Sequence, residues 1–367
     1  MRFTTILILL FFSNSIYTQN YIPIDTAHWD IKAKAYIIEK YKGKKAIYIQ
    51  AGGMTLKNQT FLNGTIEFDI FLKEEQAFPG ITFRATKNFD GEKWYIRPHL
   101  SGKPDGNQAV PLTNGVTPWQ LYFGEKYSFP YRYKFNDWTH VKLVVNNDKA
   151  QVFLDGTEKP NLSWHLFHKA QSGSISFNGG RLSGMHLANI KINTSATRIA
   201  GFKPKERKAL KNLIPTWKIS DKFEEKLLDS PNTYKKLISS RKWTNSISVE
   251  EGTAANISRK AQLFNNKSKN TVFAKIEIYS DKNQTKLFEF GYSDRVTTIL
   301  NGIPIYRGTN KWRSRDYRYL GTIGLFDAVY LPLKKGKNIL LMAVSEDFGG
   351  WLITGRFKDN SQIKIIY

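Results

Sequence analysis

The sequence predicts an all-β protein of two β-sandwich domains joined by a short helical connector, and three observations support this prediction. The chain has 367 residues, which suggests two domains and a short extra segment at roughly 150 residues per domain. Apolar residues recur with a period of two over most of its length, as in strands with one buried face. Asn-Gly, Asp-Gly and similar pairs separate these segments, and frequent tight turns between short strands are typical of sandwiches and barrels.

Residues 1–18 have the composition of a secretory signal peptide. Arg2 supplies the positive charge, residues 6–12 form an apolar stretch, and residues 13–18 are more polar. The apolar stretch is shorter than the about 20 residues that a membrane-spanning helix needs. We therefore expect a secreted protein, periplasmic or extracellular in a bacterium, with a mature chain that begins near Gln19 and without a membrane span.

The composition limits the possible functions. Hydrophobic residues make up 41% of the chain and aromatic residues 14%, which excludes a disordered protein. The formal net charge of +24 favours anionic partners, but the basic residues are spread along the chain, so no nucleic-acid partner is expected. The absence of cysteine excludes disulfides, thiolate metal sites and a cysteine nucleophile.

The first predicted domain covers residues 19–199. Ile66, Phe68 and Ile70 lie on one face of a predicted strand, and Glu67 and Asp69 lie on the other. The same alternation recurs at residues 141–145, 152–154, 175–177 and 187–192. We expect these strands to form a sandwich whose inner faces carry the apolar residues.

The pattern changes between residues 200 and 242, which we expect to form the helical connector. Residues 203–213 and 221–228 contain good helix formers with apolar residues three and four positions apart. Pro204, Pro215 and Pro231 interrupt the stretch. Strands return at residues 271–279, 286–290, 297–300, 338–344 and 351–357. A second all-β domain is therefore expected over residues 243–367.

Part of the first domain resembles a known family. Residues 137–145, Asp-Trp-Thr-His-Val-Lys-Leu-Val-Val, and residues 150–156, which end in Asp-Gly, are similar to the central hairpin of laminin G-like and concanavalin A-like lectin/glucanase domains. Residues 61–70, 80–84, 173–177 and 185–192 are similar to its other strands. The resemblance implies a jelly roll over residues 21–193, a fold that serves lectins, adhesion modules, hydrolases and lyases.

The second domain resembles a different jelly roll. Residues 297–302, which end in Leu-Asn-Gly, and residues 331–340, Leu-Pro-Leu-Lys-Lys-Gly-Lys-Asn-Ile-Leu, are similar to strands of the galactose-binding-domain-like family. That family includes the sugar-binding domain of β-galactosidases and carbohydrate-binding modules. The resemblance implies sugar binding, and a structural calcium ion is common in both families; no other cofactor is expected.

Glu67-Phe68-Asp69 is similar to part of the catalytic strand of laminarinases and agarases, which carries a further Glu on the same face. Here the third position falls on Phe71 or Leu72, and Glu74 is out of phase with the other two carboxylates. The catalytic set is therefore incomplete. The alternative interpretation is an ordinary strand with a solvated polar face.

Residues 94–122 are the densest candidate for a sugar site, because aromatic faces hold sugar C–H surfaces and planar polar groups bond hydroxyls. The alternative interpretation places Trp94 and Trp119 in the core, with the polar residues fixing the loop over residues 101–118. The candidate ligand-binding residues of the first domain are Arg84, Trp94, Tyr95, Arg97, His99, Gln108, Trp119, Gln120 and Tyr122.

A second cluster of Tyr, Trp, Arg and Asp lies in the C-terminal domain. Arg315 beside Asp316 suggests an internal ion pair, whereas Arg295, Arg313 and Arg315 suggest a fork for a sulfate or carboxylate, and the sequence leaves both interpretations open. The candidate ligand-binding residues of this domain are Tyr292, Asp294, Arg295, Trp312, Arg315 and Asp316.

We expect an exported carbohydrate-binding protein that recognises an extracellular, anionic polysaccharide without cleaving it. The first alternative is a glycoside hydrolase or polysaccharide lyase that uses Glu67, Asp69, Tyr95, Arg97 and His99; the second is an adhesion or protein-interaction module. No metal site is expected, because His99 has no second His at a metal-ligand spacing. Nucleotide-binding and serine-hydrolase motifs are absent as well, and the sequence leaves the oligomeric state open.

Overall fold

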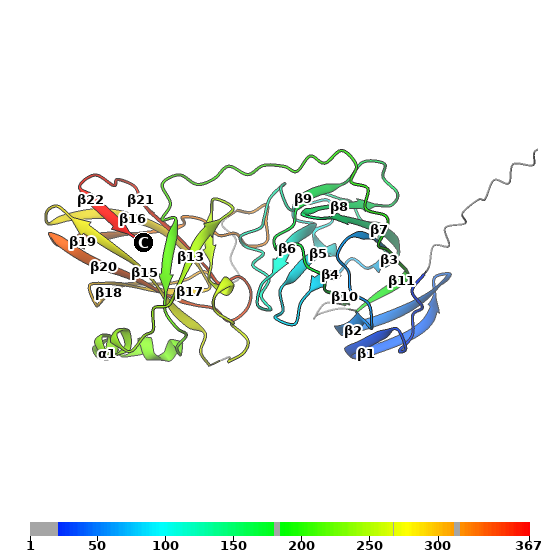
Figure 1. Ribbon diagram of the computed structural model, residues 1–367, viewed down its shortest axis with the longest axis horizontal. Helices are drawn as coiled ribbons and strands as arrows, with labels where there is room; N and C mark the ends of the chain where they lie inside the picture. The colour runs from blue at the N-terminus through cyan, green and yellow to red at the C-terminus, as the bar shows by residue number, and fades with distance from the viewer. Residues whose placement is uncertain (1–20, 180–183, 267, 312–315) are drawn as a thin grey trace, which may run out of the picture.

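The computed structural model describes residues 21–179, 184–266, 268–311 and 316–367. Figure 1 shows two β domains side by side, the first coloured blue to green and the second green to red. The predicted all-β fold of two sandwich domains is confirmed. Among the described residues, no helix is long and apolar enough to cross a membrane.

The first domain consists of one continuous, curled sheet. Its strand order is β6-β5-β4-β10-β2-β11-β3-β7-β8-β9, with β1 paired to β2 outside this path. The strands are β1 (Trp29–Tyr41), β2 (Lys44–Leu56), β3 (Gly64–Leu72), β4 (Gly80–Ala85), β5 (Gly91–Ile96), β6 (Asn107–Leu112), β7 (Asp137–Asn146), β8 (Lys149–Leu154), β9 (Leu162–His165), β10 (Ser174–Asn178) and β11 (Gly184–Asn193), with a 3-10 helix, η1 (Pro98–Leu100), after β5.

Strand β2 connects the two layers of this sandwich. Its first half pairs with β11, and Gly53 to Thr55 pair with β10 on the other layer. Between the halves, Gly52 has a φ of +158°, and a Cβ atom there would lie 2.1 Å from the Lys32 carbonyl oxygen of β1. Only glycine fits this close approach. The bend therefore curls one sheet into two layers around a core that contains Trp29, Trp94 and Trp164.

The second domain has the strand order β18-β17-β20-β15-β12-β13-β14-β21-β16-β19, with β22 paired to β15. The strands are β12 (Thr216–Ile219), β13 (Asn245–Glu250), β14 (Ala254–Asn256), β15 (Thr271–Ser280), β16 (Gln284–Ser293), β17 (Arg295–Leu300), β18 (Ile303–Thr309), β19 (Asp327–Leu333), β20 (Gly336–Ser345), β21 (Leu352–Phe357) and β22 (Ile363–Ile366). Asn301 and Gly302, with φ of 52° and 84°, form the two-residue turn between β17 and β18, as an Asn-Gly pair predicts.

Two apolar clusters stabilise the second domain. The inner cluster packs Trp217, Phe288 and Trp351 between the layers. The outer cluster packs Phe223, Leu228 and Tyr234 against Phe273 and Ile299 on the other side of the sheet. Phe223 precedes the short helices of this outer cover, which are η2 (Glu225–Asp229), η3 (Pro231–Thr233) and α1 (Tyr234–Ser239). Leu228 comes from η2 and Tyr234 from α1, and η4 (Ile257–Arg259) follows β14.

The expected connector is helical only in its second half. Residues 203–213 were predicted to be helical, but they run extended along both domains, as the long green segment in Figure 1 shows. Five basic residues within nine positions repel one another in a helix, and a helix this short needs a packed face to be stable. Instead, Arg207 donates to the Leu121 carbonyl oxygen at 2.7 Å and to Thr253 Oγ1 at 3.0 Å, which ties the segment to both domains.

The second sheet begins earlier than the sequence suggests. Strand β12 lies inside the stretch 200–242, and it pairs with β13 and β15 of the second domain. Only four residues long, it carries too short an alternation to be recognised beside the neighbouring helix formers. The connector therefore supplies both a strand and the outer cover of the second domain.

Candidate functional site

The expected binding segment 94–122 begins with a buried polar network. Tyr95 Oη donates to Gln108 Oε1 at 2.6 Å, and the Arg97 guanidinium donates to the same oxygen at 2.5 Å and forms an ion pair with Asp105. Each of these four residues is at most 6% exposed. Burial raises the pKa of the Tyr95 hydroxyl and of Asp105, although Arg97 partly offsets the effect on Asp105. These groups bond one another and present almost no surface to a ligand.

The network positions the segment that follows β6. Gln108 Nε2 donates to the carbonyl oxygens of Trp119 and Tyr122 at 2.9 and 2.6 Å. These bonds tie the segment to β6, and Leu121 and Tyr122 pack in the core of the first domain. Tyr122 Oη donates to Glu250 Oε2 at 2.5 Å, across the boundary between the domains.

Residues 113–124 form an interface with the second domain, which we call the seam. Gln120 Nε2 donates to Ser293 Oγ at 3.2 Å, and Gln120 Oε1 accepts from the Gly350 amide at 3.1 Å. The Trp119 ring lies against Gly349, where a Cβ atom would be 2.2 Å from the indole, and its centroid is 5.6 Å from that of Phe348. The two predicted aromatic clusters therefore meet, but they meet by packing against each other.

A pair of buried carboxyl groups lies on the second-domain side of the seam. Glu346 is fully buried, Asp294 is 3% exposed, and Ser293 Oγ donates to Glu346 Oε2 at 3.2 Å. Burial raises the pKa of both carboxyl groups, and the proximity of Asp294 raises that of Glu346 further. Such a pair favours a shared proton. Because neither group reaches the surface, the pair stabilises the seam and is out of reach of a substrate.

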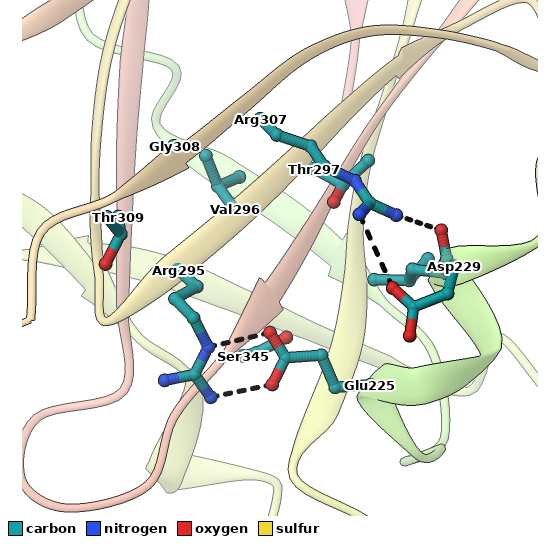
Figure 2. A pocket seen from close by; sticks show the side chains of 10 residues that line it. Glu225, Asp229, Arg295, Val296, Thr297, Arg307, Gly308, Thr309 and Ser345 are labelled. Carbon is teal, nitrogen blue, oxygen red and sulfur yellow. Dashed lines mark hydrogen bonds and ion pairs between the residues drawn. The ribbon is translucent and has the colours of Figure 1, made fainter.

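Arg295 is engaged by two carboxylates, as Figure 2 shows for one of them. It forms a bidentate pair with Glu225, with both N···O distances 2.7 Å, and a second with Asp347, with both distances 2.8 Å. Lys311 also donates to Asp347, at 2.7 Å. The guanidinium that the sequence suggested as a sulfate fork therefore has its donors occupied by the protein's own carboxylates. It lines a pocket of about 330 Å³.

The other sequence-predicted residues are scattered. Trp94 and Tyr292 are buried in the cores of the first and second domains. Arg84 is buried and donates to the Leu62 carbonyl oxygen at 2.7 Å, which anchors the turn before β3.

The ring centroids of His99 and Phe78 are 5.4 Å apart, and burial lowers the pKa of the His99 imidazole. Asp316 pairs with Arg318 at 2.8 Å; Trp312 and Arg315 lie outside the described residues.

Glu67 and Asp69 take part in a cluster on the outer face of the first sheet. His140 of β7 lies between them: its Nδ1 is 2.7 Å from Asp69 Oδ1, and its Nε2 is 3.2 Å from Glu67 Oε2. Asp69 also accepts from Lys44 at 2.7 Å and from Asn189 at 2.6 Å. A single imidazole on the neighbouring strand thus bridges the two carboxylates.

These contacts shift the pKa of all three groups toward the charged form. Bonds to Asp69 and Glu67 raise the pKa of His140 to about 9. Burial alone raises the pKa of Asp69, but the bonds from His140, Lys44 and Asn189 prevail and lower it to about 2. The His140 bond also lowers the pKa of Glu67. At neutral pH the cluster is therefore a protonated imidazole between two carboxylates.

An aromatic cluster lies beside these charges on the same outer face. Trp138 is opposite Phe71 in the β3–β7 register, and Phe71 is opposite His186 in the β3–β11 register. Tyr41 stacks on His186 with ring centroids 3.6 Å apart and meets Trp138 edge to face at 6.4 Å. Phe71 and His186 are buried, whereas Tyr41 and Trp138 are half-buried. The two exposed rings therefore rest on a buried aromatic base.

We call this surface the open face, and we define it by Glu67, Asp69, Trp138, His140 and three lysines around them, Lys44, Lys142 and Lys191. Lys44 Nζ lies 4.9 Å from the centre of the Trp138 ring. Among the described residues, no group of three or more His, Asp and Glu side chains has an arrangement that could hold a metal ion. The open face combines stacking surface, hydrogen-bond acceptors and positive charge.

His140 and Trp138 were not among the residues predicted for the site, although both lie in the stretch 137–145 that carries the family resemblance. Their alternation with Thr139 and Val141 indicates that they share the outward face of a strand. Their proximity to Asp69 and Phe71 depends on the antiparallel pairing of β3 with β7, which places His140 opposite Asp69. Strands 65 residues apart give no sign of that register in a single sequence.

No family model and no curated protein matches the chain. Three solved structures illustrate what the structure is similar to. A carbohydrate-binding module, CBM66 from Bacillus subtilis, has a TM-score of 0.35 at 15% identity and covers 44% of this chain and 93% of its own. The β-glucanase of Bacillus licheniformis has a TM-score of 0.35 at 12% identity, with coverages of 47% and 95%. A lichenase from a mouse hindgut metagenome has a TM-score of 0.34 at 11% identity, with coverages of 46% and 94%. The fold assignment rests on the sheets described above.

Proposed function

We propose that this chain is an exported glycan-binding protein and that the open face is its binding surface. The observation that carries the proposal is the adjacency of half-buried aromatic rings and a charged hydrogen-bonding cluster on one partly exposed sheet face. Sugar rings present C–H surfaces that stack on aromatic side chains and hydroxyl groups that donate to carboxylates. The residues of the seam offer the same chemistry, but their partners lie within the protein.

Trp138 and Glu67 would make the principal contacts. Trp138 is half-buried and rests on Phe71 at 5.5 Å between ring centroids, so its orientation is fixed before a ligand arrives. A fixed aromatic group loses little conformational freedom on binding. The Glu67 side chain is 27% exposed and receives one bond from His140. Its remaining lone pairs are suited to accept hydroxyl protons from a sugar bound on Trp138.

The charge of the open face suits an anionic polysaccharide. Protonated His140 and three lysines outnumber the carboxylates of Glu67 and Asp69. The whole chain has the same sign, at +24, and such a field draws polyanions to the surface. Attraction of this kind weakens as added salt shortens the Debye length. We therefore propose a uronic-acid or sulfated glycan as the ligand of the open face.

The pKa values of the open face favour binding over hydrolysis. Glycoside hydrolysis by two carboxyl groups needs one that stays protonated near neutral pH, with a raised pKa. The pKa values of Glu67 and Asp69 are both lowered. The described carboxyl groups with raised pKa values, Asp105, Asp294 and Glu346, are all buried. Among the described residues, no exposed carboxyl group with a raised pKa accompanies Glu67 and Asp69.

The proposal is tested by incubating residues 19–367 with insoluble neutral, uronic-acid and sulfated polysaccharides and measuring retention and the release of new ends. Retention on an anionic polymer that falls with added salt, without new reducing ends or unsaturated products, is the expected result. Release of new ends would show that the protein cleaves the polysaccharide and would contradict binding without cleavage. A protein that no polymer retains would contradict the proposal.

A matched pair of variants locates the surface. Trp138→Ala removes the stacking ring and is expected to weaken retention at least tenfold, equivalent to about 1.4 kcal/mol. Tyr330→Ala, which removes an aromatic side chain that is 68% exposed on the second domain, serves as the control. Equal retention of the two variants would exclude the open face as the binding surface.

A further inference from the structure

Two adjoining hollows lie on the outer face of the second domain, beside the cover formed by η2, η3 and α1. One has a volume of about 330 Å³ and is shown in Figure 2. The other has a volume of about 340 Å³. Asp229 and Arg307 line both hollows, so the side chains of this pair stand between them. Each volume is at the lower end of the 300–1,000 Å³ range typical of small-ligand pockets.

The hollows exist because the outer cover ends early. Leu228 and Tyr234 pack on the apolar part of the sheet around Ile299. Thr297, two residues before Ile299 on β17, shares its face but lies beyond the cover and lines the first hollow. The sheet face changes from apolar to polar at the edge of the cover. The strip of sheet beyond this edge is polar and only partly covered, and it lies beside the packed apolar cluster.

The first hollow has polar walls with nearly balanced charge. Its lining includes the hydroxyl groups of Thr297 and Thr309 and the carboxylates of Glu225 and Asp229. Arg295 also lines it, but its guanidinium is held by Glu225 and Asp347, as Figure 2 shows for Glu225. An anionic ligand would meet two carboxylates, and the two arginines that balance them, Arg295 and Arg307, are each paired with one of these carboxylates. A neutral polyol matches these acceptors and hydroxyl groups better.

The second hollow supplies the apolar contacts. It is lined by Tyr234, Tyr306, Pro304 and Ile305, together with the shared Asp229 and Arg307. Rings and aliphatic side chains of this kind pack against the C–H faces of sugars. Both hollows therefore combine polar groups with apolar side chains, as Leu228 and Val296 also line the first. This mixture matches the alternation of hydroxyl and C–H surfaces along an oligosaccharide.

The ion pair that separates the hollows is weak, and Arg307 has further bonds of its own. Arg307 Nη1 lies 3.4 Å from Asp229 Oδ1, and the two side chains are 53% and 72% exposed. Arg307 Nη2 donates to the Leu228 carbonyl oxygen and lies 3.4 Å from Tyr234 Oη. An exposed pair at this distance contributes roughly 0–1 kcal/mol. Figure 2 shows Arg307 reaching across from β18 toward Asp229 at the edge of the pocket. A ligand can therefore replace the contact between Arg307 and Asp229 with its own hydrogen bonds, while Nη2 keeps Arg307 anchored to the cover.

We propose that the two hollows form one groove that binds a neutral oligosaccharide, with Arg307 and Asp229 as its central polar contacts. This inference rests on the proposed glycan-binding function and adds a second site of different charge preference. Two sites on one chain increase the affinity for a polymer that carries both kinds of sugar, because the second contact becomes intramolecular. The open face would hold the acidic units, and the groove would hold the neutral ones.

The test titrates the full mature chain with neutral gluco-, xylo- and manno-oligosaccharides of two to six units, in 0.5 M salt to suppress charge attraction, as the Debye length falls to a few Å near 1 M. Wild type is compared with Arg307→Ala and Asp229→Asn in the groove and with Trp138→Ala on the open face, and each variant is also assayed for retention on the anionic polymer. Arg318→Ala is the matched control, because Arg318 is also a half-exposed arginine paired with an aspartate of the same domain. Thermal midpoints establish that all variants are folded.

We expect both groove variants to weaken oligosaccharide binding at least tenfold, while Arg318→Ala binds like wild type. If oligosaccharides bind and only Trp138→Ala weakens them, the groove is overturned and the open face stands. If anionic polymers are retained but no neutral oligosaccharide binds, the groove is again overturned and the proposed function stands. If oligosaccharides bind at the groove and no polymer is retained through Trp138, the groove stands and the open face fails.

Discussion

The seam and the open face are built from the same kinds of residue but differ in what those residues can do. Each places two carboxyl groups beside a cation and aromatic rings. In the seam, burial raises the pKa of Asp294 and Glu346. On the open face, His140 and Lys44 lower the pKa of Asp69, and His140 lowers that of Glu67. The type of residue therefore does not determine its role, whereas burial and partners do.

The difference also separates a buried interface from an accessible surface. Arg97, Tyr95 and Gln108 bond one another behind the seam, and Gln108 holds the carbonyl oxygens of Trp119 and Tyr122. Glu67 and His140 keep a quarter to a third of their side-chain surface exposed. A composition typical of sugar sites has produced a domain interface in one region and an accessible surface in the other.

The largest expected effect is the loss of the buried ion pair behind the seam. Arg97→Ala leaves Asp105 buried without its partner, which typically costs about 3–5 kcal/mol. The measurement is the free energy of unfolding from denaturant titration of the full chain. Arg318→Ala, which breaks the exposed pair with Asp316, is expected to cost less than about 1 kcal/mol. Similar losses in the two variants would remove the distinction between the regions.

The next effect concerns the buried carboxyl pair and pH. The pKa of Glu346 is raised in the folded chain, so the folded chain keeps a proton that the unfolded chain loses above about pH 4.3. Stability contributed by this proton is present at low pH and falls as pH rises, by up to about 1.4 kcal/mol per pH unit. Glu346→Gln is expected to flatten this slope between pH 5 and 8. An unchanged slope would show that the pair is ionised.

The third effect concerns His140, which lies between Glu67 and Asp69 on the open face. Its contribution to stability is smaller and is lost at higher pH. The pKa of His140 is about 9 in the folded chain, against about 6.5 when unfolded, so its contribution is complete below pH 6.5 and is lost as pH rises through 9. Because His140 is about a third exposed, we expect His140→Ala to cost about 1 kcal/mol at pH 6 and nearly nothing at pH 10. His165→Ala, at the more exposed pair with Asp148, is the control. A cost for His140→Ala that does not change with pH would contradict the assigned pKa.

The smallest effect on stability is expected for Glu67→Gln. The side chain keeps its shape and loses one partly exposed contact with His140, so the free energy of unfolding should change by less than about 0.5 kcal/mol. Retention on polysaccharide should nevertheless fall several-fold, because an amide oxygen is a weaker acceptor than a carboxylate. Unchanged retention would remove Glu67 from the binding surface and leave Trp138 as its main contact.

The sequence predicts the fold better than the site. Period-two segments such as residues 65–72 and the Asn301-Gly302 turn are local patterns, and they fold as β3 and the β17–β18 hairpin. The helix expected over residues 203–213 is absent, because Arg207 gains more from bonds to both domains than from helical turns. Propensity is a weak guide where tertiary contacts compete with it.

Local patterns fail for the site because its geometry depends on distant pairing. The aromatic and polar density of residues 94–122 is genuine, but the sequence does not reveal that the second domain packs on Gln120 and Trp119. Likewise, His140 becomes notable only when the sheet places it opposite Asp69. Both facts depend on which strands and domains are neighbours. The alternation of apolar and polar residues does not encode this.

The most direct test of the central claim compares Trp138→Ala with Trp119→Ala for retention on the polysaccharide that holds the wild-type chain. Both variants remove an indole, one from the open face and one from the seam, and both are assayed at a temperature where each is folded. The account predicts that Trp138→Ala loses retention and that Trp119→Ala keeps it. Loss with Trp119→Ala and full retention with Trp138→Ala would contradict the account and return the binding site to the seam.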